Sequence, residues 1–289
     1  MLKTVWLTEQ QNTENGTAML LGGFDGLHLG HRALLSCAQK SGFPVGLMTI
    51  VGGKEGKSLF TAAEREDIFK NCGVDFVFEL PFEEIKNLSP KAFIDLLYQE
   101  FSPKLFVCGE DFRFGYQAKG TPETLKWDTR VRVEVCSLLE KYGKKISASE
   151  IKDALCKGEV SRANELLGEK YFLSGKVEKD RQVGRTLGFP TANIRYPQEK
   201  ISLKKGVYET VSILNGKLYR GITNYGARPT FSDETVWTET YFDGFSGDLY
   251  GKELKIEFVR YLRDIEKFQD AESLKKQLQT DVRRIREND

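Results

Sequence analysis

The stretch Gly22-Gly23-Phe24-Asp25-Gly26-Leu27-His28-Leu29-Gly30-His31 contains the only two histidines of this 289-residue chain. It follows the apolar run 18–21 and precedes a predicted helix over 32–40. An apolar strand that breaks at glycines and leads into a helix presents backbone N–H groups to a phosphate. An imidazole donates a hydrogen bond in either charge state, and as a cation it offsets charge that develops on a phosphoryl oxygen. The stretch therefore predicts an α/β fold with a phosphate-handling site after this strand.

The histidine pair leaves two other interpretations open. Histidines at i and i+3 can share a metal ion, but Asp25 is the only third ligand nearby and no cysteine stands close enough to complete a tetrahedral set. The loop could also serve the structure alone. The H-x-G-H spacing resembles the signature of adenylyl and cytidylyl transferases, and this resemblance implies that His28 and His31 hold nucleotide phosphates while the α-phosphate is attacked.

The composition bounds the class of partner. The 43 basic and 42 acidic residues nearly cancel, so we expect small-molecule substrates and neither nucleic acid nor an anionic membrane. The five cysteines are scattered singly, without a C-x-x-C motif, as is typical of free thiols in a reducing compartment. No run of 18 apolar residues occurs. We expect a cytoplasmic protein, and its oligomeric state stays open.

The first part of the chain alternates apolar and helical segments. Buried strands are predicted over the following ranges: 45–50, 75–80, 104–108 and 131–135. A capping box at Thr61 and Glu64 and the pair Ser89-Pro90 mark helix starts between them. Such alternation predicts a Rossmann-like parallel sheet with helices on both faces and a ligand at the carboxyl ends of its strands. Helices over 149–157 and 160–167 close this domain, which we place at residues 1–168.

The remaining residues, 169–289, have the pattern of a second domain. Two apolar segments flank Asn215-Gly216, which predicts a type I′ hairpin over 207–224. Further strands are expected over 236–242 and 254–262, and an amphipathic helix over 270–286 ends the chain. A small antiparallel β-barrel with a C-terminal helix accounts for this order of elements.

Six ordered motifs, taken together, resemble those of prokaryotic bifunctional FAD synthetase, the family that combines riboflavin kinase with FMN adenylyltransferase. The resemblance runs from about residue 18 to the C-terminus. Its motifs are Gly23-Phe24-Asp25-Gly26-Leu27-His28-Leu29-Gly30-His31, Gly109-Glu110-Asp111-Phe112-Arg113-Phe114-Gly115, Lys145-Ile146-Ser147-Ala148-Ser149-Glu150-Ile151-Lys152, Gly184-Arg185-Thr186-Leu187-Gly188-Phe189-Pro190-Thr191-Ala192-Asn193, Asn224-Tyr225-Gly226-Ala227-Arg228-Pro229-Thr230-Phe231, and Glu239 ahead of Asp248-Leu249-Tyr250-Gly251.

For adenylyl transfer the resemblance implies that the FMN phosphate attacks the α-phosphorus of ATP and that pyrophosphate leaves. The protein then has to align the groups and offset charge, with His28 and His31 as the catalytic residues. Ser147, Ser149 and Lys152 would hold the leaving phosphates at a helix N-terminus. The other residues expected to bind nucleotide or flavin here are Gly22, Phe24, Asp25, Gly30, Gly109, Asp111 and Phe112.

For the kinase the resemblance implies that Glu239 is the general base, which takes the proton of the riboflavin 5′-hydroxyl as that hydroxyl attacks the γ-phosphate. Thr191 and Asn193 supply two neutral oxygens suited to Mg²⁺, the expected metal. The other expected binding residues are Gly184, Arg185, Gly188, Pro190 and Arg263. ATP would be the co-substrate in both domains, and riboflavin, FMN and FAD would be substrates or products.

One motif departs from the family pattern. The usual Ser-Ser-Thr-x-Ile-Arg stands here with Ala148 and Lys152, which removes a hydroxyl and replaces a forked guanidinium by a point charge. A single-activity enzyme with one decayed site is therefore one alternative. A flavin-binding regulator without chemistry is another, although such a protein needs neither a base at Glu239 nor a metal site. The flavins formed from riboflavin, ATP and Mg²⁺ discriminate among the three.

Overall fold

The structure, which is a computed structural model, describes the following residues: 3–6, 16–52, 56–179, 188–227 and 235–287. The chain divides into two compact units, Met1–Ala148 and Ser149–Asp289. The domain boundary expected at residue 168 lies within the second of them. Within the described residues, no helix is both long and apolar enough to cross a bilayer.

The first unit contains a six-stranded sheet of order β1-β4-β3-β2-β5-β6. Its strands are β1 (Lys3–Trp6), β2 (Thr17–Leu21), β3 (Val45–Val51), β4 (Phe76–Pro81), β5 (Pro103–Gly109) and β6 (Arg132–Cys136). Strands β2 to β6 run parallel, and β1 pairs antiparallel with β4 at one edge. The four strands predicted between residues 45 and 135 are confirmed to within one residue at each end.

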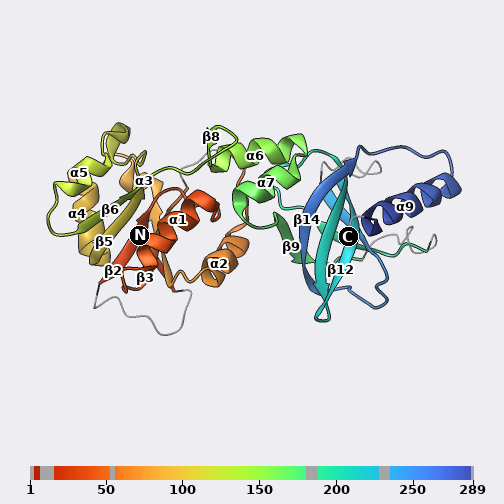
Figure 1. Cartoon of the computed structure of the whole chain (residues 1–289). Helices are drawn as coiled ribbons and strands as arrows, with labels where there is room; N and C mark the ends of the chain where they lie inside the picture. Colours follow the sequence, from red (N-terminus) through yellow and green to blue (C-terminus); the bar gives the residue numbers. More distant parts are fainter. Residues whose placement is uncertain (1–2, 7–15, 53–55, 180–187, 228–234, 288–289) are drawn as a thin grey trace. The chain divides into compact units, whose positions relative to one another are not determined.

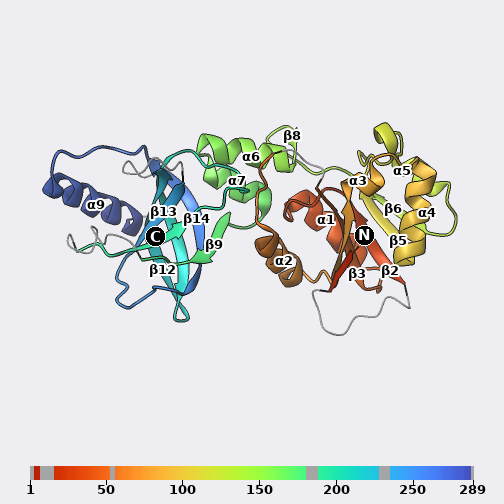
Figure 2. The same ribbon diagram turned by 180° about the vertical axis from the view of Figure 1, so that it is seen from behind.

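Helices cover this sheet on both sides, as Figure 1 and, from behind, Figure 2 show. They are α1 (Leu29–Gln39), α2 (Ala62–Asn71), α3 (Phe82–Ile85), α4 (Pro90–Phe101) and α5 (Pro122–Lys126), with the 3₁₀ turn η2 (Tyr116–Ala118) and the two-stranded ladder of β7 (Glu140–Lys141) and β8 (Lys144–Lys145). The predicted capping box starts α2, since the Thr61 and Glu64 side chains each accept the other residue's N–H. On one face α4 packs Phe93 and Leu97 against Phe106 of the sheet. The expected parallel sheet between helices is confirmed.

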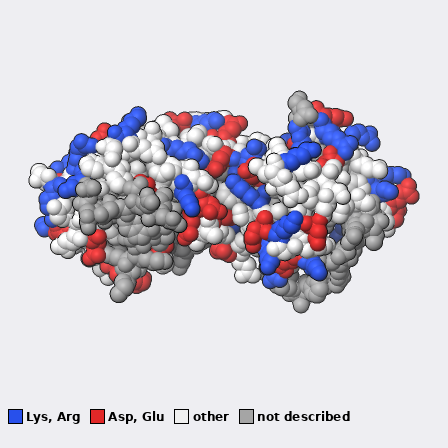
Figure 3. Space-filling model, turned by 90° about the horizontal axis from the view of Figure 1, so that it is seen from below, with Lys and Arg blue, Asp and Glu red and all other residues white. Residues whose placement is uncertain are grey.

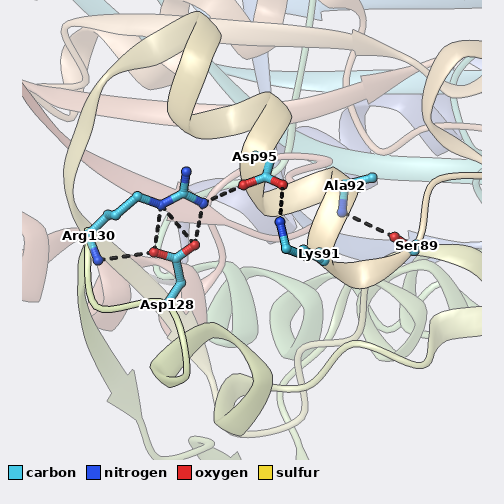
Figure 4. A network of polar contacts seen from close by, with 6 residues as sticks. All are labelled: Ser89, Lys91, Ala92, Asp95, Asp128 and Arg130. Carbon is cyan, nitrogen blue, oxygen red and sulfur yellow. Dashed lines mark hydrogen bonds and ion pairs between the residues drawn. The ribbon is translucent and has the colours of Figure 1, made fainter.

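A polar network fixes helix α4 to the loop before β6 (Figure 4). Ser89 caps the helix by accepting the Ala92 N–H at 3.2 Å, as the sequence predicts. Asp95 of the same helix binds Lys91 at 2.9 Å and also Arg130, which in turn binds Asp128. These groups are partly exposed, so each pair adds only a small amount of stability.

The second unit is a nearly closed antiparallel barrel of order β10-β13-β12-β11-β14-β9. Its strands are β9 (Phe172–Lys176), β10 (Thr191–Arg195), β11 (Gly206–Leu214), β12 (Lys217–Ala227), β13 (Val236–Phe242) and β14 (Glu253–Arg263). The Glu178 N–H donates to the Asn193 carbonyl at 2.8 Å, where the chain beyond β9 meets β10. Asn215 and Gly216 both have positive φ, at 51° and 78°, so the predicted type I′ hairpin is confirmed.

The helices described in this unit are α6 (Ala148–Lys157, which begins at the unit boundary), α7 (Val160–Leu167) and α9 (Ala271–Arg286). Asn164 of α7 donates to the Phe258 carbonyl at 2.9 Å and accepts from the Tyr171 N–H at 2.8 Å. The Leu155 carbonyl of α6 accepts from the Lys204 N–H at 3.2 Å. Helices α6 and α7 are thus bonded to the barrel, and the predicted C-terminal helix α9 is confirmed.

Candidate active sites

The first candidate site lies where the strand order of the parallel sheet reverses. From β2 the chain builds β3 and β4 on one side, and it then returns to place β5 on the other side of β2. The neighbouring strands β2 and β5 are parallel, with Leu21 opposite Cys108, so the loops that follow them leave the same edge of the sheet. Open α/β sheets bind ligands at this topological switch point. The histidine stretch and Gly109 therefore share an edge.

The two imidazoles are held by backbone groups of their own loop. His28 is the N-cap of α1, and its Nδ1 accepts the His31 N–H at 3.3 Å. His31 Nδ1 lies 2.9 Å from the Gly26 carbonyl oxygen, which can only accept. His31 therefore carries hydrogen on Nδ1, whereas neutral His28 carries it on Nε2. His28 offers an Nε2–H donor in its neutral form, and His31 can gain or lose a proton at Nε2.

The rings are stacked, with centroids 3.7 Å apart and planes 18° from parallel. Burial, together with the neighbouring His31 and Lys145, lowers the pKa of His28 from 6.5 to about 3. The side chain is therefore neutral near pH 7. The sequence leaves either imidazole open as a cation, and the lowered pKa of His28 argues against that role for His28.

Small residues and Phe24 make this stack possible. A Cβ on Gly30 would lie 3.1 Å from the His28 ring, so only glycine lets the ring settle there without displacement. Phe24 is buried and its ring centroid lies 4.5 Å from that of His31. Gly22, directly after β2, lies close to the Phe24 ring, since its Cβ would be 3.2 Å away. These predicted binding residues thus pack around one another.

Asp25 ties the histidine loop to the segment before α2. Both of its carboxylate oxygens accept the Leu59 N–H at 3.0 Å, and Arg65 lies 3.8 Å away. Because its acceptors are engaged within the protein, Asp25 holds the loop in place. Among the described residues, no three or more His, Cys, Asp or Glu side chains are grouped so that they could hold a metal ion, so the shared-metal interpretation of the histidine pair finds no support there.

Asp111, in the loop after β5, meets a lysine of β8 at this site. Gly109 is the last residue of β5, and its carbonyl accepts the Phe112 N–H at 3.0 Å. Asp111 forms an ion pair with Lys145, the same lysine whose charge lowers the pKa of His28. Lys145 lies in the Lys-Ile-Ser motif but is not among the predicted site residues, because no local pattern in the sequence shows which loops meet.

The predicted serine motif spans the boundary between the units. Ser147 is the last residue before α6 and lies in the first unit, with Ile146. The Ile146 carbonyl would be 3.8 Å from a Cβ on Gly30, so this segment reaches the start of α1. Ser149 and Lys152 lie in the first two turns of α6, in the second unit.

The second candidate site lies on the outer face of the barrel. Ala192 and Ile194 of β10 are buried with Thr238 and Thr240 of β13, so these residues point inward. Thr191, Asn193 and Glu239 alternate with them and lie on the opposite face. These three are the predicted metal and base residues.

Pairing of the strands brings Glu239 between two asparagines. Asn193 of β10 and Asn224 of β12 each stand directly opposite Glu239 in the antiparallel ladders. Side chains of such pairs have Cβ atoms about 4.5–5.5 Å apart. Asn224 belongs to one of the ordered motifs but is not among the predicted site residues, because its position depends on a register that the sequence does not state.

Asn193 carries the clearest sign of a missing partner. Its side chain is 4 % exposed, and among the described residues its Oδ1 has no hydrogen-bond partner. A buried amide oxygen without a partner costs free energy unless a ligand or ion satisfies it. Asn193 is among the residues that line a pocket of about 580 Å³. Its lining includes Pro190, Thr191, Asn193, Phe245, Asp248 and Tyr250.

The remaining predicted kinase residues are Gly184, Arg185, Gly188, Pro190 and Arg263. Gly188 is exposed and has a φ of 84°, which favours glycine, and Pro190 lines the pocket. Gly184 and Arg185 lie outside the described residues. Arg263, at the end of β14, directs its guanidinium to Asp281 of α9, with Nη2 2.7 Å from the carboxylate.

Comparison with known families covers both units. A family model described as riboflavin kinase matches residues 167–288, and one described as FAD synthetase matches residues 10–150. A solved structure titled as a macrolide-efflux protein from Streptococcus pneumoniae is similar with a TM-score of 0.86 and 28% identity over 94% of either chain. The name of that protein refers to macrolide efflux, whereas the two family models are described as riboflavin kinase and FAD synthetase.

Curated relatives match nearly the whole chain. The bifunctional riboflavin kinase/FMN adenylyltransferase of Bacillus subtilis (strain 168) is 34% identical and covers 97% of this chain and 96% of its own length. The enzyme of the same description from Escherichia coli (strain K12) is 30% identical over 96% of this chain and 94% of its own. The chain thus belongs to the bifunctional riboflavin kinase/FMN adenylyltransferase family, and it uses ATP to convert riboflavin to FMN and FMN to FAD.

Proposed function

We propose that the two activities are divided between the two sites, with adenylyl transfer at the histidine stack and phosphorylation at the Glu239 face. The observation that carries this division is the difference in chemistry between the two sets of side chains. FMN attacks through a phosphate that is already ionised at neutral pH, so its reaction needs alignment and charge compensation and no base. Riboflavin attacks through a hydroxyl, which has to lose a proton.

At the first site, neutral His28 donates from Nε2 to a phosphate oxygen of ATP. His31 donates from Nε2 as negative charge moves toward the leaving pyrophosphate. Lys145 and the helix start at Ser147, with Ser149 and Lys152, supply further donors to the phosphates. Gly109, Asp111 and Phe112, after the neighbouring strand, bind the nucleoside part of a substrate, with Gly22, Phe24, Asp25 and Gly30 keeping the histidines in place.

At the second site, Glu239 accepts the proton of the riboflavin 5′-hydroxyl. Thr191 and Asn193 fit Mg²⁺, since both present neutral oxygens and the buried Asn193 Oδ1 lacks a partner among the described residues. When bound, Mg²⁺ offsets charge on the ATP phosphates. The pocket beside these residues receives ATP, with Gly184, Arg185, Gly188 and Pro190 at its phosphates. Glu239 stands two residues from Tyr241, which faces Thr191, so base and metal ligands share one surface.

The molecule serves small substrates in the cytoplasm, without nucleic acid or membrane as a partner. Basic and acidic side chains alternate on the face that Figure 3 displays, so the described residues there do not gather by sign. A protein that follows phosphate backbones or anionic lipids needs a patch of one sign. The nearly balanced totals of 43 basic and 42 acidic residues agree with this.

A time course with the purified chain tests the proposal. Riboflavin, ATP and Mg²⁺ are incubated with the enzyme, and the flavins are separated at intervals. FMN should appear first and FAD later. Removal of the metal with a chelator should stop the first step, which is the phosphorylation of riboflavin. Accumulation of FMN without FAD would show that Ala148 and Lys152 have weakened adenylyl transfer. FMN formation at an unchanged rate in the presence of the chelator would show that the kinase reaction does not need Mg²⁺.

A further inference from the structure

Among the residues that the structure describes, helix α9 is buried mainly at its last turns. Residues 271–276 are exposed except for Leu274, which is half-buried, whereas Asp281, Val282 and Ile285 are buried. A carboxylate is an unusual group to bury, because removing its charge from water costs far more than a surface pair returns. Asp281 therefore needs an explanation beyond general helix docking.

The partner of this carboxylate is Arg263. Its Nε lies 3.1 Å from both Asp281 oxygens and its Nη2 lies 2.7 Å from Oδ2, while Gln277 donates to Oδ1 at 3.0 Å. The side chains are 14 % and 2 % exposed. This fork geometry is available to Arg and not to Lys. In contrast, Arg286 near the end of the same helix binds Asp243 with its own side chain 63 % exposed.

The last turns of α9 lie on the segment that leads to the metal residues. Val282 and Ile285 form one cluster with Phe189 of that segment and Ile222 of β12, and Tyr241 packs against the cluster. Phe189 meets Tyr241 edge to face, with centroids 5.0 Å apart. Tyr241 stands directly opposite Thr191 in the β10–β13 ladder. A continuous path of packed side chains thus joins Asp281 to Thr191.

We propose that Arg263 and Asp281 are positioning residues of the kinase: their buried pair fixes α9, and through Val282, Phe189 and Tyr241 it sets the position of Thr191 and Asn193. This rests on the proposed roles of Thr191 and Asn193 in the kinase site. It gives Arg263 an indirect role in place of direct contact with a substrate. Misplacing a reacting group by 1 Å can cost about 100-fold in rate, so a distant anchor can control the reaction.

The test compares Asp281→Asn with Glu272→Gln, an acid-to-amide change at an exposed position of the same helix. FMN formation should fall about 10-fold to 100-fold in Asp281→Asn, mainly in kcat, and stay within about twofold in Glu272→Gln. FAD formation from supplied FMN should be unchanged in both full-length variants and reports that the chain is intact. Without any ligand, hydrogen exchange of the amides of residues 189–193 should be faster in Asp281→Asn only.

A second control separates positioning from general stability. Ile256→Ala removes a fully buried side chain inside the barrel, away from α9, and lowers the thermal midpoint of the second unit. Assayed well below that midpoint, it should keep its kinase kcat and its exchange at residues 189–193. Equal kcat losses in Ile256→Ala and Asp281→Asn would reduce the pair to a stability element and overturn the proposal.

Arg263 variants decide between direct and indirect action. Arg263→Lys should resemble Asp281→Asn in exchange and should lose less activity, because the charge survives without the fork. Loss of activity in Arg263→Lys with normal activity in Asp281→Asn would mean that Arg263 contacts a substrate, which would overturn the proposal. Full kinase activity in Thr191→Ala would show that Thr191 is not a required metal ligand. The hydrogen-exchange measurement would still decide whether the Arg263–Asp281 pair orders residues 189–193.

Discussion

In the proposed division of the reactions, the histidine site of the first unit and the Glu239 site of the second use the same co-substrate, ATP, in different ways. The first is built on a loop and a helix start, where two stacked imidazoles, that of His28 in its neutral form, and backbone groups would face a phosphate. The second is built on one face of an antiparallel sheet, where a carboxylate stands between two amides. The difference follows the nucleophile: an ionised phosphate needs donors, and a hydroxyl needs a base. One chain can hold both because neither site borrows its key side chains from the other.

The largest expected effect comes from removing the base. Glu239→Gln keeps the shape of the side chain but cannot accept the proton, so riboflavin phosphorylation should fall about 10²-fold to 10⁴-fold. FAD formation from FMN should continue at its normal rate, as measured by separation of flavins from the same preparation. If phosphorylation persists while Thr191→Ala abolishes it, metal binding and positioning carry the step and the base assignment is wrong.

The reciprocal change comes next. His31→Ala removes the imidazole that can exchange a proton at the phosphate, and FAD formation should fall on the order of 10²-fold or more. Riboflavin phosphorylation by the same variant should remain near normal. A comparable loss of both activities would break the division between the sites.

Much of this arrangement can be read from sequence, and the exceptions share a cause. Strands β3 to β6 and the Asn215-Gly216 hairpin give local signals that the structure confirms. Strand β10 is not among the predicted strands, because its alternation of polar and apolar side chains is only five residues long. The pairing of Asn193 with Glu239, the ion pair of Asp111 with Lys145, and that of Arg263 with Asp281 join residues distant in sequence. Such contacts depend on register and packing, which no local pattern encodes.

A third prediction concerns the independence of the kinase unit. A fragment that starts at Ser149 keeps α6 and α7, whereas one that starts at Gly168 loses the Asn164 bonds to Tyr171 and Phe258. Both should fold and phosphorylate riboflavin, and the shorter one should melt at least about 5 °C lower. Differential scanning calorimetry measures this. Equal melting temperatures would show that α6 and α7 do not stabilise the kinase unit, and would support the expected domain boundary at residue 168.

The smallest effect is a pH dependence confined to the first unit. Because the folded pKa of His28 is about 3 and the unfolded value is 6.5, only the unfolded chain takes up this proton between those values. The stability of the first unit should therefore decrease as the pH is lowered through this window, by up to about 1.4 kcal/mol per pH unit from this residue. His28→Asn should flatten the slope in urea titrations from pH 6 to pH 4. An unchanged slope would show that His28 is not buried in its neutral form.

The cap at the start of α1 matters for the design of a variant that loses FMN adenylyltransferase activity and keeps riboflavin kinase activity. His28 caps the first turn of its helix and is also proposed to contact the ATP phosphates, so replacing it would disturb the fold and the reaction together. His31 contributes only its backbone N–H to that closure, and this group survives any substitution except proline. An engineer seeking a chain that stops at FMN should therefore edit position 31 and leave position 28 alone.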